Sequence, residues 1–245
     1  MCVRLILFDI DGTLVDTGGA GRRALLAAFE RLFQPTSLST AGQVPFAGRT
    51  DVAIFRDLAR ELGIGADHLA KKRTEFERAY EVTLRHELHL ENAPPQCVLP
   101  GVLPLLEALA ARADARVGLL TGNIAVGARL KLERFNLDRF FEGGGFGDDA
   151  PDRRGVARAA FKDMVRRTGV DFVAADVVVV GDTEKDVDCA RANGFRAIAV
   201  DTGWAEPGSL TAARPDTLFE DLSNTDAVLR AIFEEGSDHA SSHSE

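Results

Sequence analysis

Short apolar runs alternate with segments of helical periodicity along most of the chain. Four of these runs have the length and the nearly continuous apolar composition of strands that are buried on both faces. The pattern therefore predicts an α/β fold, in which right-handed crossovers place helices on both faces of a parallel sheet. The predicted strands are Val3–Phe8, Val117–Leu120, Val177–Val180 and Ala197–Val200. Helical patterns occupy Pro104–Ala111, Ile124–Phe135, Val156–Val165 and Ala190–Asn193.

The interval from Thr17 to Pro95 contains helical patterns instead of strands. Its apolar residues form three stripes at helical spacing, and the third stripe predicts one longer helix. We therefore expect a core of residues 1–16 and 96–233, a helical insertion of residues 17–95, and a disordered polar tail of residues 234–245. The stripes run from Ala24 to Leu32, from Val52 to Leu62 and from Leu69 to Leu84.

Composition and charge restrict which partners and which cellular compartment we expect for the protein. The 245 residues carry a formal net charge of −9, which argues against nucleic acid and against an anionic membrane as partners. No apolar stretch approaches the ~20 residues of a membrane span, and the N-terminus lacks the features of a signal peptide. Three cysteines without paired spacing indicate a reducing compartment, so we expect a cytoplasmic protein. No interface stripe distinguishes a monomer from a homodimer.

Two carboxylates, Asp9 and Asp11, follow the first predicted strand directly. Because side chains at i and i+2 of an extended chain lie on one side, both lean toward one pocket. Carboxylates so close together repel each other, so one of them takes a proton or a cation lies between them. Gly12 then allows the backbone to turn or to approach a ligand. The alternative is a helix-capping Asp followed by ordinary turn residues.

Two further predicted strands also end in polar residues. Thr121–Asn123 follows the second strand and opens a helix, and Gly181–Asp186 follows the third. Ligands of open parallel sheets bind at the carboxyl ends of the strands. There, Asp9 and Asp182 would share a hard divalent cation such as Mg²⁺, and Thr121 with the N–H groups after it would form an anion site. This combination indicates phosphoryl transfer.

In this order, the motifs resemble those of the haloacid dehalogenase superfamily. DxDGT begins at Asp9, Thr-Gly-Asn begins at Thr121, and GDxxxD spans Gly181–Asp186. The resemblance covers the chain up to about Ile232, and it implies a Rossmann-like core with the helical insertion as a C1 cap. Within the superfamily, the chain resembles the phosphoglycolate phosphatase and β-phosphoglucomutase branches.

The resemblance also implies roles for these residues. Asp9 is expected to be the nucleophile that becomes an aspartyl phosphate, and Asp11 is expected to be the general acid and base. Thr121 is expected to hold the phosphoryl oxygens, beside the backbone of Gly122 and Asn123.

Mg²⁺ is the cofactor that the resemblance implies. Its ligands are expected to be the carboxylates of Asp9 and Asp182 and the main-chain carbonyl of Asp11. Asp186 is expected to lie behind these ligands or to reach the ion through water.

One motif departs from the family pattern. Most relatives carry a Lys before the helix that precedes the GDxxxD strand, but here the first Lys is Lys162, too far along that helix. Arg153 or Arg154 is the expected substitute, and the register leaves the choice open. An Arg pairs with phosphate or carboxylate in a fork, so it can still cancel the repulsion between Asp9 and phosphate. The alternative for either Arg is a solvated helix start.

Within the insertion, Gly48–Asp51 is the best candidate for contact with a substrate. Arg49 is expected to meet a second anionic group of the substrate, with Thr50 beside it. The alternative is that Thr50 or Asp51 only caps the following helix.

The leading hypothesis is a Mg²⁺-dependent phosphatase that acts on a small phosphorylated metabolite. A sugar phosphomutase of the β-phosphoglucomutase type shares the same motifs. A catalytically silent binding protein is the third possibility, and the missing Lys is the one feature in its favour. Asp11 argues against a 2-haloacid dehalogenase, because that branch lacks the second carboxylate.

Overall fold

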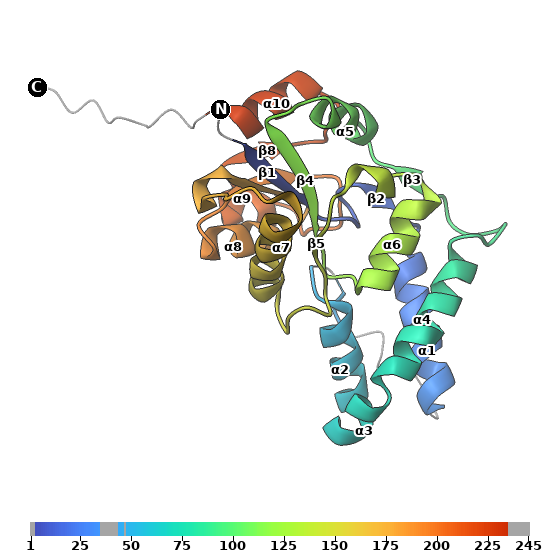
Figure 1. Ribbon diagram of the computed structural model, residues 1–245. Coiled ribbons are helices and arrows are strands. Elements are labelled where there is room, and N and C mark those ends of the chain that lie inside the picture. The colour runs from blue at the N-terminus through green and yellow to red at the C-terminus, as the bar shows by residue number, and fades with distance from the viewer. Residues whose placement is uncertain (1–2, 35–43, 47, 235–245) are drawn as a thin grey trace, which may run out of the picture.

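The computed structural model describes residues 3–34, 44–46 and 48–234, and its centre is a six-stranded sheet. All five strand pairings are parallel, which confirms the predicted α/β fold class. The strand order is β5-β4-β1-β6-β7-β8 (Figure 1), so the first strand of the chain lies between two later ones. The strands are β1 Arg4–Phe8, β4 Ala115–Leu120, β5 Gly144–Gly145, β6 Val177–Gly181, β7 Arg196–Val200 and β8 Thr217–Phe219.

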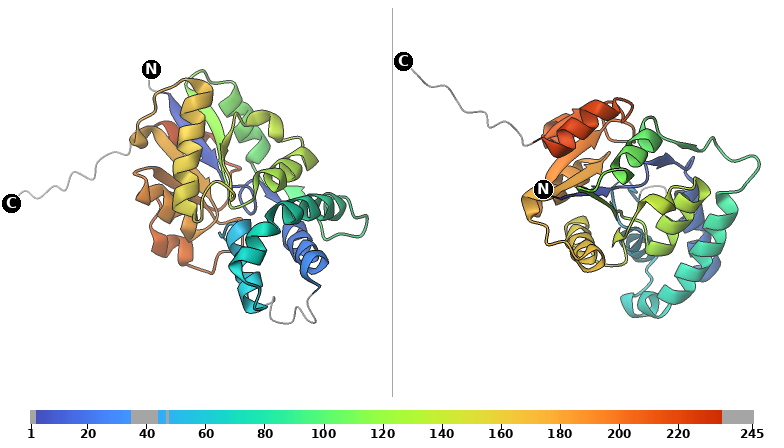
Figure 2. Two further views of the ribbon diagram at one scale, coloured as in Figure 1. Left: turned by 60° about the horizontal axis from the view of Figure 1, so that its bottom comes forward. Right: turned by 45° about the horizontal axis from the view of Figure 1, so that its top comes forward.

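Both faces of the sheet are covered by helices, as Figure 2 shows. Side chains alternate along β1: Leu5 and Leu7 face one apolar cluster, whereas Ile6 and Phe8 face the other. Burial on both faces explains why the strands are nearly continuous apolar runs. The first cluster includes residues of α7 Arg153–Thr168, α8 Glu184–Ala192 and α9 Ser209–Ala213, and the second includes residues of α5 Val102–Ala110, α6 Ala125–Arg134 and α10 Thr225–Phe233.

The helical insertion has an apolar cluster of its own. Aromatic rings form its centre, where the rings of Phe55 and Phe76 stack with their centroids 3.8 Å apart. Ile124 and Leu130, at the start and in the middle of α6, join the same cluster, so the insertion packs directly on the core. Its helices, in the lower part of Figure 1, are α1 Ala20–Phe33, α2 Asp51–Glu61, α3 Ala66–Lys71 and α4 Arg73–Glu87.

A small antiparallel ribbon joins the insertion to the core. Strand β2, Val15–Asp16, pairs with β3, Cys97–Val98, so the chain leaves and re-enters the core at the same place. The division into a core of residues 1–16 and 96–233 and a cap of residues 17–95 stays a prediction.

The structure differs from the predicted elements in several respects. The long third helix of the insertion is two helices, α3 and α4, that meet at Lys72. Helix α8 begins at Glu184, six residues earlier than predicted, because Thr183 and Asp186 form a reciprocal capping box. Strands β2, β3, β5 and β8 and helices α9 and α10 were not predicted. The tail that was expected to be disordered lies outside the described residues beyond Glu234.

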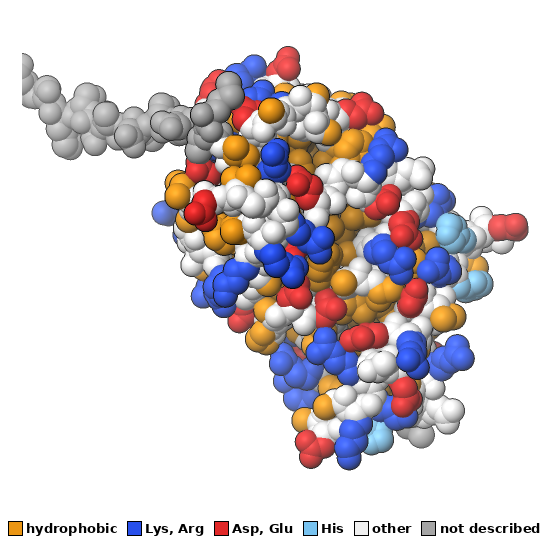
Figure 3. Space-filling view, in the orientation of Figure 1, with side chains coloured by type: hydrophobic (Ala, Val, Ile, Leu, Met, Phe, Trp, Pro, Cys, Tyr) orange, Lys and Arg blue, Asp and Glu red, His pale blue; other side chains and the backbone are white. Residues whose placement is uncertain are grey.

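On the face drawn in Figure 3, Lys and Arg side chains intermingle with Asp and Glu. None of the helices in the described part of the chain is long and apolar enough to cross a membrane.

Candidate active site

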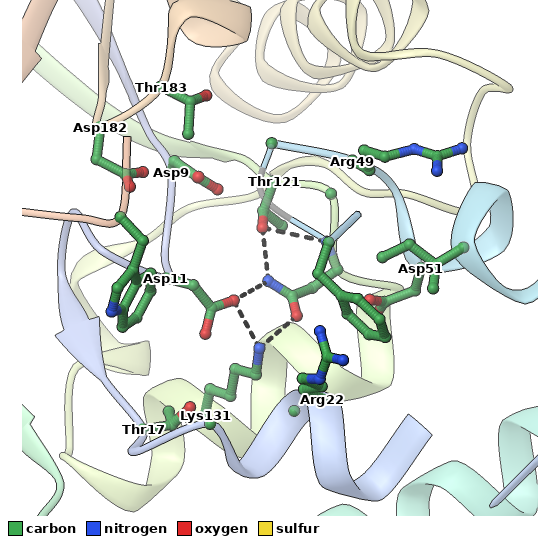
Figure 4. Close-up of a pocket in the computed structure, with 18 of the residues that line it drawn as sticks. Asp9, Asp11, Thr17, Arg22, Arg49, Asp51, Thr121, Lys131, Asp182 and Thr183 are labelled. Atoms are coloured by element: carbon green, nitrogen blue, oxygen red, sulfur yellow. Dashed lines mark hydrogen bonds and ion pairs between the residues drawn. The ribbon is translucent and has the colours of Figure 1, made fainter. Parts of the chain in front are cut away.

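Three neighbouring strands deliver the predicted motifs to one cavity. Because β1 lies between β4 and β6, Asp9, Thr121 and Asp182 come together at the carboxyl edge of the sheet (Figure 4). The cavity has a volume of about 390 Å³, and residues of α1 and of the loop before α2 close it from the side of the insertion. Trp204, which is 59% exposed, forms part of the wall on the core side.

Local backbone geometry brings the carboxylates of β1 and β6 together. The N–H of Asp9 donates to the carbonyl of Val180 at 2.9 Å, which aligns the two strand ends. Gly12 has φ +78°, and a Cβ at this position would overlap the carboxylate of Asp182. Thr13 donates its hydroxyl to Asp182 at 3.3 Å. The DxDGT sequence therefore shapes the backbone as well as supplying carboxylates.

Asp9, Asp182 and Asp186 form a buried acidic cluster, in which one oxygen from each lies within 4.8 Å of the others. Burial raises the pKa of Asp9 to about 6, although Arg153 opposes the shift. Burial, with the neighbouring carboxylates of Asp9 and Asp186, holds the pKa of Asp182 well above its ordinary range. In both carboxyl groups, burial more than the neighbouring charges favours the protonated form, which a bound cation would displace.

The donor set fits a divalent cation. Arg153 pairs with Asp9 and Asp186, and Lys131 pairs with Asp11, whereas Asp182 forms no ion pair within the described part of the chain. Carboxylate oxygens are the ligands that Mg²⁺ prefers. The side chain of Asp11 is not one of the three that form the cluster. It lies across the cavity, where it accepts a hydrogen bond from Lys131.

Arg153 is the cation at the acidic cluster. It is 7% exposed, its Nη2 lies 3.0 Å from Oδ2 of Asp9, and it also forms an ion pair with Asp186. The position follows from the start of α7, where Asp152 accepts the N–H of Gly155 at 2.7 Å and so caps the helix.

Arg154 points away from the cavity, contrary to its place among the expected catalytic residues. It pairs with Asp188 at 2.7 Å, and both side chains are more than half exposed. Adjacent residues of a helix point about 100° apart, so only one of the two arginines can face the site. Lys162, also on α7, is exposed.

Asn123 links the anion loop to Asp11. Its Nδ2 donates to Oδ2 of Asp11 and to Oγ1 of Thr121, both at 2.8 Å. The N–H of Asn123 also donates to Oγ1 of Thr121 at 3.2 Å. These two bonds fill the acceptor positions of the hydroxyl, so its proton is left to donate into the cavity.

The loop before α2 rests on the anion loop. The N–H of Asp51 donates to the carbonyl of Gly122 at 2.8 Å, and Oδ2 of Asp51 accepts the N–H of Ile124 at 3.0 Å. A Cβ at Gly122 would overlap the carbonyl of Arg49, so a glycine is required for this contact.

Two predicted substrate contacts have partners within the insertion. Arg49 lines the cavity, but its guanidinium forms an ion pair with Asp57. Thr50 accepts the N–H of Ala53 at 3.1 Å and caps α2, as the alternative interpretation of this loop stated. Contact of either residue with a substrate stays a prediction.

Sequence analysis missed two cations at the cavity. Lys131, on α6, lies 2.6 Å from Asp11 and is 3% exposed. Its signal in the sequence was a charge next to Leu132 on the inward face of a predicted helix. Arg22, on α1, lies over the ring of Phe46 at 4.5 Å from its centroid and also lines the cavity. Arg22 lies on the face of this amphipathic helix that the sequence pattern assigns to solvent, so the sequence carried no sign that it lines the cavity.

Comparison with known proteins decides the family. A model described as haloacid dehalogenase-like hydrolase matches residues 3–194. The chain belongs to this family. Membership of the haloacid dehalogenase-like hydrolases confirms the resemblance drawn from the motifs and makes the protein a hydrolase.

Several members of this hydrolase family are similar over nearly the whole chain. A phosphoglycolate phosphatase of Pseudomonas syringae pv. tomato is 27% identical over 219 residues, which are 89% of this chain and 77% of that protein. One from Agrobacterium fabrum is 27% identical over 243 residues, with coverage of 94% and 92%. The crystal structure of a predicted phosphoglycolate phosphatase from Haemophilus somnus shares the fold, with a TM-score of 0.69 at 19% identity and coverage of 93% and 98%.

The two arginines of α7 should differ sharply in their effect on stability. Arg153→Met leaves Asp9 and Asp186 buried without their cation, which should cost about 3–5 kcal/mol of unfolding free energy. Arg154→Met removes an exposed ion pair and should leave stability nearly unchanged. Urea unfolding at pH 7.5 with chelator measures both. Equal losses in the two variants would contradict the assignment of Arg153 to the cluster.

Asp51 predicts a pH dependence of stability. Burial raises its pKa to about 6, above the ordinary value near 3.8, although Lys131 opposes the shift. The folded state therefore holds the proton more tightly than the unfolded chain, and stability is lost as the pH rises from about 4 to about 6. Asp51→Asn keeps an acceptor for Ile124 but cannot ionise. Relative to wild type, the variant should gain up to about 3 kcal/mol between pH 4 and pH 7.5. A difference that is the same at both pH values would contradict this account.

Proposed function

We propose that this hydrolase is a Mg²⁺-dependent phosphatase that cleaves a small phosphorylated metabolite through an aspartyl phosphate on Asp9. The observation that carries the proposal is the lining of one cavity by Asp9, by a second carboxylate at Asp11, and by Thr121 at the start of α6. The names of the relatives, phosphoglycolate phosphatases, support the reaction class.

In the first step, an oxygen of Asp9 attacks phosphorus, and the bond from phosphorus to the ester oxygen breaks. Asp11, protonated at this stage, gives its proton to the departing oxygen, so an alcohol leaves and Asp11 becomes a carboxylate. Thr121 donates its hydroxyl to a phosphoryl oxygen. Arg153, 3.0 Å from Asp9, lowers the repulsion between that carboxylate and the arriving phosphate.

In the second step, water attacks phosphorus and gives a proton to Asp11. The bond from phosphorus to the Asp9 oxygen breaks, which releases inorganic phosphate and restores both carboxyl groups to their starting states. Asp9, Asp182 and the carbonyl of Asp11 would hold Mg²⁺, with Asp186 close behind them, and the ion would supply positive charge to the phosphoryl oxygens.

Arg22 favours substrates that carry a second anionic group. Four cationic side chains line the cavity, and Arg49, Lys131 and Arg153 each pair with a carboxylate. Arg22 has no carboxylate partner in the part of the chain that the structure describes; it lies over Phe46 instead. A substrate carboxylate would supply the missing partner, so 2-phosphoglycolate is the first compound to test.

The decisive experiment is phosphate release from a panel of phosphorylated metabolites with Mg²⁺ and with chelator. Asp9→Asn removes the attacking carboxylate without changing its shape, so it should abolish release, at least ~10⁴-fold below wild type. Asp188→Asn is the matched control, because it makes the same change at an exposed position, and it should retain activity. Release by Asp9→Asn at the wild-type rate would refute the mechanism, and an inactive wild type would favour a phosphomutase or a silent binding protein.

Arg22 has a separate test in substrate selectivity. Arg22→Gln should raise KM for 2-phosphoglycolate by about 10–100-fold, because a charge-assisted hydrogen bond of about 1.5–3 kcal/mol is lost. Activity toward ethyl phosphate, which lacks a second anionic group, should change by less than about 3-fold. Arg78→Gln, at an exposed site on α4, serves as the control. An equal effect on both esters would remove Arg22 from the substrate site.

A further inference from the structure

Lys131 is a buried cation whose position the proposed mechanism does not use. It lies in the second turn of α6 and is 3% exposed. Its Nζ is 2.6 Å from Oδ2 of Asp11 and 2.6 Å from Oδ1 of Asn123. Burial of an ammonium group is costly unless hydrogen bonds and an opposite charge compensate it. Both partners of Lys131 belong to the predicted catalytic motifs (Figure 4).

The two oxygens of Asp11 have different surroundings. Oδ2 accepts one hydrogen bond from Lys131 at 2.6 Å and a second from Asn123 Nδ2 at 2.8 Å. Oδ1 accepts none from the described part of the chain, and the side chain of Asp11 is 31% exposed where it meets the cavity. A proton that enters or leaves the carboxyl group therefore has one accessible oxygen.

Lys131 also determines how Asn123 is turned. Because Nζ can only donate, Asn123 must present Oδ1 to it, and the amide NH₂ then faces Asp11 and Thr121. The reverse orientation of the amide would place two donors together at Nζ and an acceptor against the Asp11 carboxylate. One ammonium group thus fixes the orientation of both side chains.

We propose that Lys131 is a positioning residue that holds Oδ2 of Asp11, so that Oδ1 alone delivers the proton to the leaving oxygen and later takes one from water. The inference rests on the proposed phosphatase function. In the first step, the bond from phosphorus to the ester oxygen breaks as Oδ1 gives its proton to that oxygen. Without Lys131, the carboxyl group of Asp11 rotates so that Oδ1 and Oδ2 exchange places. The proton then no longer lies against the leaving oxygen.

The insertion holds Lys131 in place. A Cβ at Gly21, in the first turn of α1, would lie 2.8 Å from Nζ, so the absence of a side chain lets α1 approach the ammonium group. Nζ is the far end of a flexible side chain, and Gly21→Ala would push it from its partners without obstructing the backbone. Alanine also favours a helix more than glycine does, so this variant should fold.

The leaving group provides the test. An alkoxide needs a proton as it departs, whereas p-nitrophenolate is a much weaker base and leaves without one. Because kcat/KM reports the steps through departure, the ratio of kcat/KM for ethyl phosphate to that for p-nitrophenyl phosphate measures proton delivery, since neither ester carries a second anionic group that could bind a cation of the cavity. Any common loss, such as a displaced Thr121, cancels in this ratio.

Lys131→Met, assayed in full-length protein with saturating Mg²⁺, should lower kcat/KM for ethyl phosphate by about 100-fold, and that for p-nitrophenyl phosphate by less than about 5-fold. Gly21→Ala should shift the ratio in the same direction in a protein that remains folded. Lys162→Met makes the same substitution at an exposed position of α7 and should leave the ratio unchanged.

A ratio that stays at the wild-type value in Lys131→Met and Gly21→Ala would overturn the proposal, whether both esters are affected equally or neither is. If Lys131→Met does not fold, Gly21→Ala alone decides. Failure of the phosphatase function is distinguishable, because wild type would then hydrolyse neither ester.

Discussion

The site depends on how buried negative charge is held at the end of β1. Asp9, Asp182 and Asp186 lie within 4.8 Å of one another, almost without exposure to water. A fold retains such a cluster only where positive charge or bound protons compensate it. Arg153 supplies part of the compensation, and the capped start of α7 fixes where this guanidinium can lie. The remaining charge is what makes the cluster suited to a divalent ion.

The loop Thr121–Asn123 connects this charge cluster to the insertion. On the cavity side, it presents the Thr121 hydroxyl and the Asn123 amide. On the other side, the carbonyl of Gly122 accepts the N–H of Asp51, and the carboxylate of Asp51 accepts the N–H of Ile124, the first residue after the loop. Movement of the insertion away from the core would break these contacts, so it would act directly on the anion-binding loop.

The sequence was sufficient to predict the four central strands of the sheet, β4, β1, β6 and β7, including the three strand ends that carry the motifs. The apolar runs were unambiguous, and the polar residues directly after them could reach only one edge of a parallel sheet. The choice between Arg153 and Arg154 could not be predicted, because it depends on where α7 begins, and a shift of one residue turns a side chain by about 100°.

Residues whose environment depends on packing between distant segments were harder to predict. The partner of Arg49 became clear only when α2 placed Asp57 against it. Lys131 lies 120 positions from Asp11 in the sequence, and helical periodicity alone suggested only that an inward position carried a charge.

The position of Trp204 gives the molecule a built-in optical reporter. It is the one tryptophan in the sequence, and it belongs to the wall of the cavity on the core side. Indole emission responds to the polarity around the ring, so the tryptophan fluorescence of this protein reports on the wall of the cavity. Occupancy of the site can therefore be followed in the unlabelled wild-type chain, without a substitution near the catalytic groups.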